Sequence, residues 1–175
     1  GYAEAAQEEE ESRGLAIKLA MAVAMADGHL DESEGLTIKE WIVRQVSVYQ
    51  EKKQAELKEI YNTAMREAYE AATNNMLTLS PFTARLNELD SDPLKYESLE
   101  WCHEVMAADG VVDAEEMRVI HSLTNALGLD ADEIAKMRDK HVVGIDASSA
   151  GQADIESTLG IDPSWDHDRI KKHLQ

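Results

Sequence analysis

The chain contains one cysteine, Cys102, among its 175 residues. A single cysteine excludes an internal disulfide and a cysteine-rich zinc site, and it fits a reducing compartment, so we expect a cytoplasmic protein. The sequence has no apolar run of the roughly 18 residues that a membrane-spanning helix needs, so we expect no direct membrane insertion. Its N-terminus is acidic where a secretory leader would be basic, so no leader is expected.

Basic residues are scarce relative to acidic ones. Lysine and arginine number 17 against 35 aspartates and glutamates, which gives a formal net charge of −18. A field of that sign repels phosphate groups, so no nucleic-acid partner is expected, and docking on anionic lipid is disfavoured. It favours cations and basic protein surfaces. Hydrophobic residues still make up 43% of the chain, which is enough to build a core.

Prolines and glycines are few and fall between stretches of helical periodicity, which predicts an all-α fold. The expected helices span residues 15–27, 31–49, 51–75, 80–89, 92–109, 113–127 and 130–141. The expected organisation is an acidic flexible lead-in at 1–14, a helical domain at 15–141, a linker at 142–153 and a short helical tail at 154–175.

An internal repeat with an offset of 82 residues is the most informative feature. Residues 26–34 align with residues 108–116, and five of these nine positions are identical. Repeated helical hairpins commonly assemble face to face around a shared core. We therefore expect a bundle of about seven helices, built from two repeated hairpins that pack as a pseudo-twofold pair.

Each repeat predicts a sharp corner between two helices. Its glycine ends the first helix in the left-handed conformation, and the apolar residue two positions later enters the core. The following aspartate caps the next helix, and the glutamate three residues on completes a capping box. These residues are Gly28, Leu30, Asp31 and Glu34 in the first corner and Gly110, Val112, Asp113 and Glu116 in the second.

Capping does not explain Asp27 and Asp109. An aspartate at a helix C-terminus faces the negative end of the helix dipole and needs a partner or a cation. Clusters of carboxylate oxygens suit calcium or magnesium, although the glycine directly after the first aspartate excludes an EF-hand loop. Helix caps alone remain the simpler interpretation. The six candidate metal ligands are Asp27, Asp31, Glu34, Asp109, Asp113 and Glu116.

The paired Ala-Asp-Gly-x-(Leu/Val)-Asp-x-x-Glu turns resemble those of the TerB tellurite-resistance family, a motif also found in the TerB-like N-terminal region of DjlA-type J-proteins. The resemblance covers residues 15–141. It implies a TerB-like bundle with an acidic surface, membership of a bacterial tellurite or chemical-stress system, and no enzyme activity. We therefore expect a non-enzymatic interaction module whose acidic corners face a divalent cation or a basic protein partner, for example in a membrane-associated stress complex.

The C-terminal tail has a second resemblance. Residues 157–163 and 168–174 look like the opening of a J-domain, but the chain contains no His-Pro-Asp tripeptide. This resemblance keeps open the alternative of an adaptor region in a DjlA-like co-chaperone. A short helix-turn-helix tail without that kinship is equally compatible with the sequence.

Enzymatic alternatives find little support. A carboxylate di-metal site needs two Glu-x-x-His pairs, and only Glu100 with His103 supplies one, so a carboxylate metalloenzyme stays the weakest alternative. Cys102 shares an apolar helical stripe with its neighbours, which indicates a buried small hydrophobe rather than a nucleophile. Trp41 and Trp101 are expected to be anchors where helices cross. No cofactor other than calcium or magnesium, and no small-molecule substrate, is expected.

Overall fold

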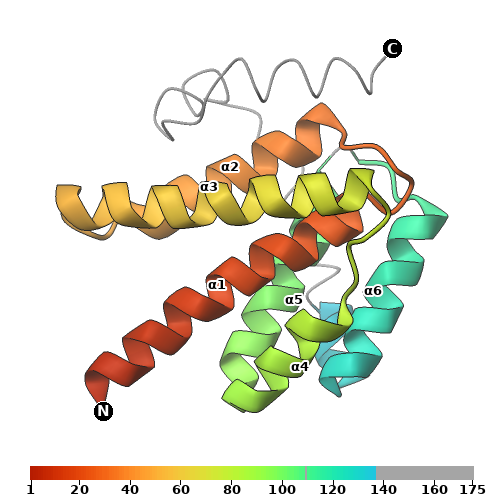
Figure 1. Cartoon of the computed structure of the whole chain (residues 1–175). Coiled ribbons are helices and arrows are strands. Elements are labelled where there is room, and N and C mark those ends of the chain that lie inside the picture. Colours follow the sequence, from red (N-terminus) through yellow and green to blue (C-terminus); the bar gives the residue numbers. More distant parts are fainter. Residues whose placement is uncertain (109, 137–175) are drawn as a thin grey trace.

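The computed structural model describes residues 1–108 and 110–136, and regular structure in this part is entirely helical (Figure 1). A helical segment at 131–136 follows the six labelled helices. The expected all-α class with about seven helices is therefore confirmed. The labelled helices are α1 (Tyr2–Ala24), α2 (Glu32–Val46), α3 (Glu51–Thr73), α4 (Ser80–Leu89), α5 (Asp92–Met106) and α6 (Ala114–Leu127). The expected linker and tail lie outside the described residues.

The expected flexible lead-in, residues 1–14, is instead the first half of α1. Ion pairs to other helices stabilise it. The Glu10 carboxylate lies 3.0 Å from Nζ of Lys53 in α3. The Glu11 carboxylate accepts two hydrogen bonds from the Arg85 guanidinium of α4, at 2.6 and 2.9 Å. These hydrogen bonds also lower the pKa of Glu11. The partners are far away in sequence, so the local acidic composition gave no sign of them.

The core is organised around the second half of α1, which packs against every other labelled helix. Figure 1 shows α1 running through the middle of the bundle, between α3 on one side and α4 and α5 on the other. Ile17, Leu19, Met21 and Val23 are completely buried. A helix that is apolar on most of its circumference must be enclosed in this way.

The two repeated hairpins, α1–α2 and α5–α6, pack as the repeat predicts. α1 lies along α5, while α2 packs on α5 and α1 packs on α6, which is the reciprocal pattern of a twofold pair. The helix boundaries keep the same 82-residue interval, since α1 ends at Ala24 and α5 at Met106. Trp41 of α2 stacks on Trp101 of α5, with ring centroids 3.9 Å apart, which confirms both as anchors at a helix crossing.

None of the helices in the described ranges is both long and apolar enough to cross a membrane.

Candidate functional site: two repeated acidic corners

The first corner connects α1 to α2. After the helix ends, the backbone N–H of Ala26 donates to the carbonyl of Val23 at 3.2 Å, and that of Gly28 donates to the carbonyl of Met25 at 2.9 Å. Gly28 has a φ of +90°, in the left-handed region. The chain thereby reverses within a few residues, as the glycine predicts.

The second corner connects α5 to α6 with the same geometry. The N–H of Ala108 donates to Val105 at 3.1 Å, and that of Gly110 donates to Ala107 at 3.0 Å. Gly110 has a φ of +76°. Every one of these contacts is the first-corner contact shifted by the repeat interval. The duplication seen in the sequence is therefore a duplication of backbone conformation.

Each corner ends on an aspartate that caps the following helix. The Asp31 carboxylate accepts a hydrogen bond from the N–H of Ser33 at 3.4 Å, and the Asp113 carboxylate accepts one from Glu115 at 2.7 Å. Both aspartates have extended backbones, as N-cap residues do. At the second corner the capping box is complete, because the N–H of Asp113 donates to the Glu116 carboxylate at 3.3 Å. Both predicted aspartate caps are confirmed, and the predicted capping box is confirmed at the second corner.

The remaining carboxylates differ in exposure. Asp27 is exposed, and one of its oxygens accepts a hydrogen bond from the N–H of His29 at 3.0 Å. This hydrogen bond offsets the unfavourable position at a helix C-terminus without requiring a cation. Glu34 and Glu116 are buried, at 4% and 6% exposure. The first corner therefore presents Asp27 to solvent, with Asp31 partly covered and Glu34 inside.

In the described part of the chain, no three histidine, cysteine, aspartate or glutamate side chains are grouped so as to hold a metal ion. Asp109 lies outside the described residues, so the structure does not show whether Asp109, Asp113 and Glu116 come together. The assignment of the six corner acids as metal ligands stays a prediction.

One expectation for the second corner is wrong. Leu30 is buried, at 2% exposure, but its counterpart Val112 is 51% exposed and the adjacent Val111 is 66% exposed. The first hairpin is enclosed by α3, which packs on both α1 and α2. Among the described residues no helix of that length covers α5 and α6 in the same way, so the second corner lies at the edge of the bundle.

Replacing either corner glycine with valine should lower the free energy of unfolding by about 1–2 kcal/mol, because a β-branched residue is strained at positive φ. A Cβ at Gly28 or Gly110 would meet no heavy atom within 4 Å, so the cost comes from the backbone and not from a clash. Urea unfolding measures it. Gly14→Ala, in the middle of α1, is the control and should raise stability by about 0.5–1 kcal/mol. A valine that is neutral at both corners would contradict the left-handed assignment.

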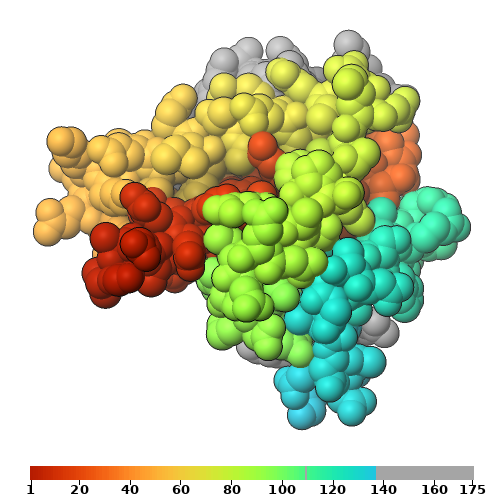
Figure 2. Space-filling view, turned by 60° about the horizontal axis from the view of Figure 1, so that its bottom comes forward, coloured from red at the N-terminus to blue at the C-terminus, as the bar shows by residue number. Residues whose placement is uncertain are grey.

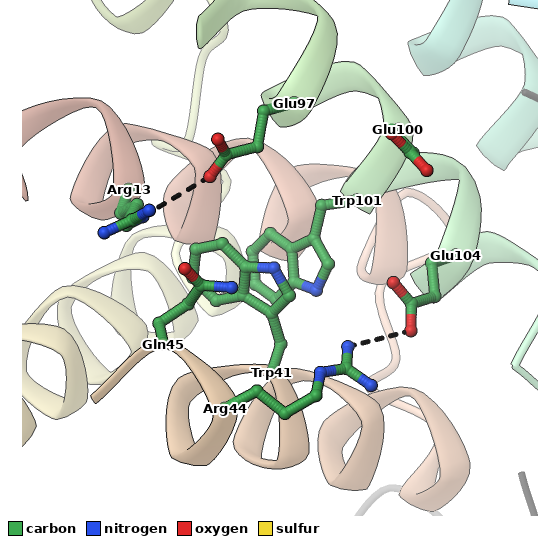
Figure 3. Close-up of a pocket in the computed structure, with 8 residues that line it drawn as sticks. All are labelled: Arg13, Trp41, Arg44, Gln45, Glu97, Glu100, Trp101 and Glu104. Atoms are coloured by element: carbon green, nitrogen blue, oxygen red, sulfur yellow. Dashed lines mark hydrogen bonds and ion pairs between the residues drawn. The ribbon is translucent and has the colours of Figure 1, made fainter. Parts of the chain in front are cut away.

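A hollow of about 360 Å³ lies beside the tryptophan pair, and the sequence analysis did not predict it (Figure 3). At its rim, Arg13 of α1 contacts Glu97 of α5 at 3.3 Å, and Arg44 of α2 contacts Glu104 of α5 at 3.0 Å. These ion pairs join three helices across the hollow. These glutamates neutralise the two arginines. We therefore interpret the hollow as part of the structural junction between the two hairpins.

Two of the residues considered for catalysis, Cys102 and His103, are buried. Cys102 is completely buried, and burial raises the pKa of its thiol far above the ordinary range, which confirms its interpretation as a core residue. His103, the histidine of the single Glu-x-x-His pair, is 1% exposed. A thiol held in its protonated form is a poor nucleophile.

Comparison with known families supports the kinship inferred from the corners. The model of the family described as tellurite resistance protein TerB matches residues 44–139, more than half of the chain. The match begins within α2 and contains the whole second corner, while the first corner precedes it. Searches among curated proteins and among solved structures gave no match. The J-domain-like tail lies outside both the matched and the described residues. With more than half of its length matched and both of its corners built alike, the chain belongs to the TerB tellurite-resistance family.

Proposed function

We propose that this TerB-family chain is a non-enzymatic interaction module of a tellurite or chemical-stress response in the cytoplasm. Its two corners present carboxylates to a divalent cation or to a basic protein partner. The observation that supports the proposal is the repeated corner geometry, in which Gly28 and Gly110 turn the chain in the same way. In the sequence an aspartate precedes each of these glycines.

The charge distribution supports an electrostatic mode of recognition. The chain carries a formal net charge of −18, and the capping aspartates lie at the helix N-termini, where the helix dipole favours negative groups. A field of this sign attracts basic partners and accelerates their encounter at low ionic strength. At the first corner the solvent-facing carboxylate is that of Asp27, so this residue is the expected point of contact.

The cation half of the proposal predicts saturable binding of calcium or magnesium in isothermal titration calorimetry. The double variant Asp27→Asn/Asp109→Asn should weaken that binding at least about tenfold, because it removes one charged ligand from each corner. Asparagine at 27 keeps a side-chain oxygen that can accept the N–H of His29.

The matched control is Glu51→Gln/Glu56→Gln, which removes the same charge from exposed positions of α3 and should leave binding unchanged. If the parent chain gives no heat of binding with either cation, the cation part of the proposal is rejected and the basic protein partner remains as the expected ligand. Equal losses in the two double variants would show a general charge effect and no site at the corners.

The sequence of the tail supports one alternative, an adaptor region of a DjlA-like co-chaperone. Residues 157–163 and 168–174 resemble the opening of a J-domain. Stimulation of an Hsp70-type ATPase by this chain would support it, whereas a rate equal to that of the ATPase alone would count against it.

A further inference from the structure

A hollow of about 450 Å³ lies between α1 and α3, on a surface separate from the two corners. Its floor is apolar and includes Gly14 and Leu15 of α1 and Ile60 of α3. Ile60 is 54% exposed, although isoleucine is among the residues most often buried. In Figure 2 the first half of α1 (red) is exposed beside α3 (gold to yellow). We call this hollow the α1–α3 groove.

Gly14 is the unexpected residue in this groove. Glycine in a helix interior costs about 0.5–1 kcal/mol relative to alanine. Neither of the usual reasons for glycine applies at Gly14, since its φ lies outside the left-handed region and a Cβ there would meet no heavy atom within 4 Å. The packing of the chain on itself therefore does not require glycine here. Its missing side chain leaves open space at the floor of the groove.

The rim of the groove is acidic on both sides. α1 contributes Glu10 and Glu11, and α3 contributes Glu59 and Glu67, against one lysine, Lys18. Ion pairs to cations of this chain engage three of these glutamates. In the described ranges no ion pair engages Glu59, which is exposed. Glu59 is therefore the rim carboxylate that offers uncompensated charge to a partner, and the groove is complementary to an apolar stripe with a positive charge beside it.

The size of the groove fits a short helix. Its lining residues extend over eight residue steps on each helix, from Glu10 to Lys18 and from Glu59 to Glu67. Eight steps of an α-helix measure about 12 Å, the length of two turns. Two turns carry apolar anchors at positions i, i+3 or i+4, and i+7, which is the usual mode of recognition of a helix in a groove.

We propose that the α1–α3 groove binds an amphipathic helix of a partner protein, with its apolar stripe over Gly14 and Ile60 and a flanking lysine or arginine beside Glu59. A second copy of this chain is a poor occupant, because it carries the same net charge of −18. The contact area is small, so we expect a weak and transient complex.

The probe is a synthetic amphipathic helix with leucines at every third or fourth position and lysines on both flanks, labelled for fluorescence anisotropy. Its affinity for the full chain should fall at least about tenfold in Gly14→Leu, which fills the floor, and in Ile60→Ser, which removes the exposed apolar anchor. Binding should weaken as salt is added, because the rim charges are exposed.

Matched controls separate the groove from general effects. Ala5→Leu adds the same side chain to an exposed position of α1 outside the groove, and Val48→Ser removes an apolar side chain that is 80% exposed elsewhere. Both should bind the probe like the parent chain. Circular dichroism should show every variant folded, since leucine is a better helix former than glycine and Ile60 is outside the core.

Equal binding of a probe with glutamate in place of lysine, or equal binding by Gly14→Leu and the parent, would overturn the proposal. So would a dimer of the chain alone that Gly14→Leu dissociates in sedimentation velocity. Asp27→Asn/Asp109→Asn should leave the probe affinity unchanged within about twofold, because the corners are a separate surface. Failure at the groove is thus distinguishable from failure at the corners.

Discussion

Replacing Trp101 with alanine is expected to lower the free energy of unfolding by about 3–5 kcal/mol, a large share of the stability of a domain this size. Trp101 is 1% exposed and stacks on Trp41 at the junction of α5 and α2. Its removal leaves a cavity where the two repeated hairpins meet. Urea unfolding followed by circular dichroism measures the change.

Two further variants identify the source of that loss. Trp101→Phe keeps a ring against Trp41 and removes a buried indole N–H that has no hydrogen-bond partner among the described residues, so it should cost less than half as much as alanine. A double-mutant cycle of Trp41→Ala and Trp101→Ala should give a coupling of about 0.5–1.5 kcal/mol. A loss below about 1 kcal/mol for Trp101→Ala would contradict a packed junction at this position.

The Cys102 thiol is expected to react with a disulfide reagent about a thousandfold or more slowly in the native chain than in urea. The side chain is completely buried, and burial raises the pKa of the thiol. Both effects suppress the reactive thiolate, so modification requires the helices around α5 to open. The rate is followed by absorbance at neutral pH.

The denatured chain is the internal control, since Cys102 is the only cysteine of the sequence. The rate should rise with urea in parallel with the unfolding curve. Native reactivity equal to that of a small-molecule thiol would show that α5 is not enclosed. It would also reopen the possibility of a chemical role for Cys102.

The family match and the repeat are complementary evidence. The TerB match contains the second corner but starts after the first. The first corner is connected to the second by identical spacing, by the same left-handed glycine and by the same backbone hydrogen bonds. The same glycine turn thus occurs at both corners, and equivalent substitutions can be made in each.

Local features of the molecule were predictable from the sequence. Gly28 and Gly110 take the left-handed conformation, with φ of +90° and +76°, and Asp31 and Asp113 cap the helices that follow them. Such features depend on residues within one turn of each other, so spacing is sufficient to find them. The burial of the second half of α1 was also predictable, because apolar residues surround the helix there.

Other features could not be predicted from the sequence, because they depend on how the helices pack. The first half of α1 is helical although residues 1–14 look solvated, and Glu10 and Glu11 form ion pairs there with Lys53 of α3 and Arg85 of α4. Val112 is exposed although it matches Leu30, because the enclosure of the two corners differs. The same holds for the candidate site, since the sequence names all six acids but not that Glu34 and Glu116 are buried while Asp27 faces solvent.

The sequence by itself determined the helical class, the two corners and their caps, since these follow from backbone conformation and contacts between near neighbours in the chain. Only the tertiary structure decided which carboxylates reach solvent, which ion pairs join the helices and where the α1–α3 groove opens. Those properties depend on distances between residues far apart in sequence, and such distances exist only after the helices have packed.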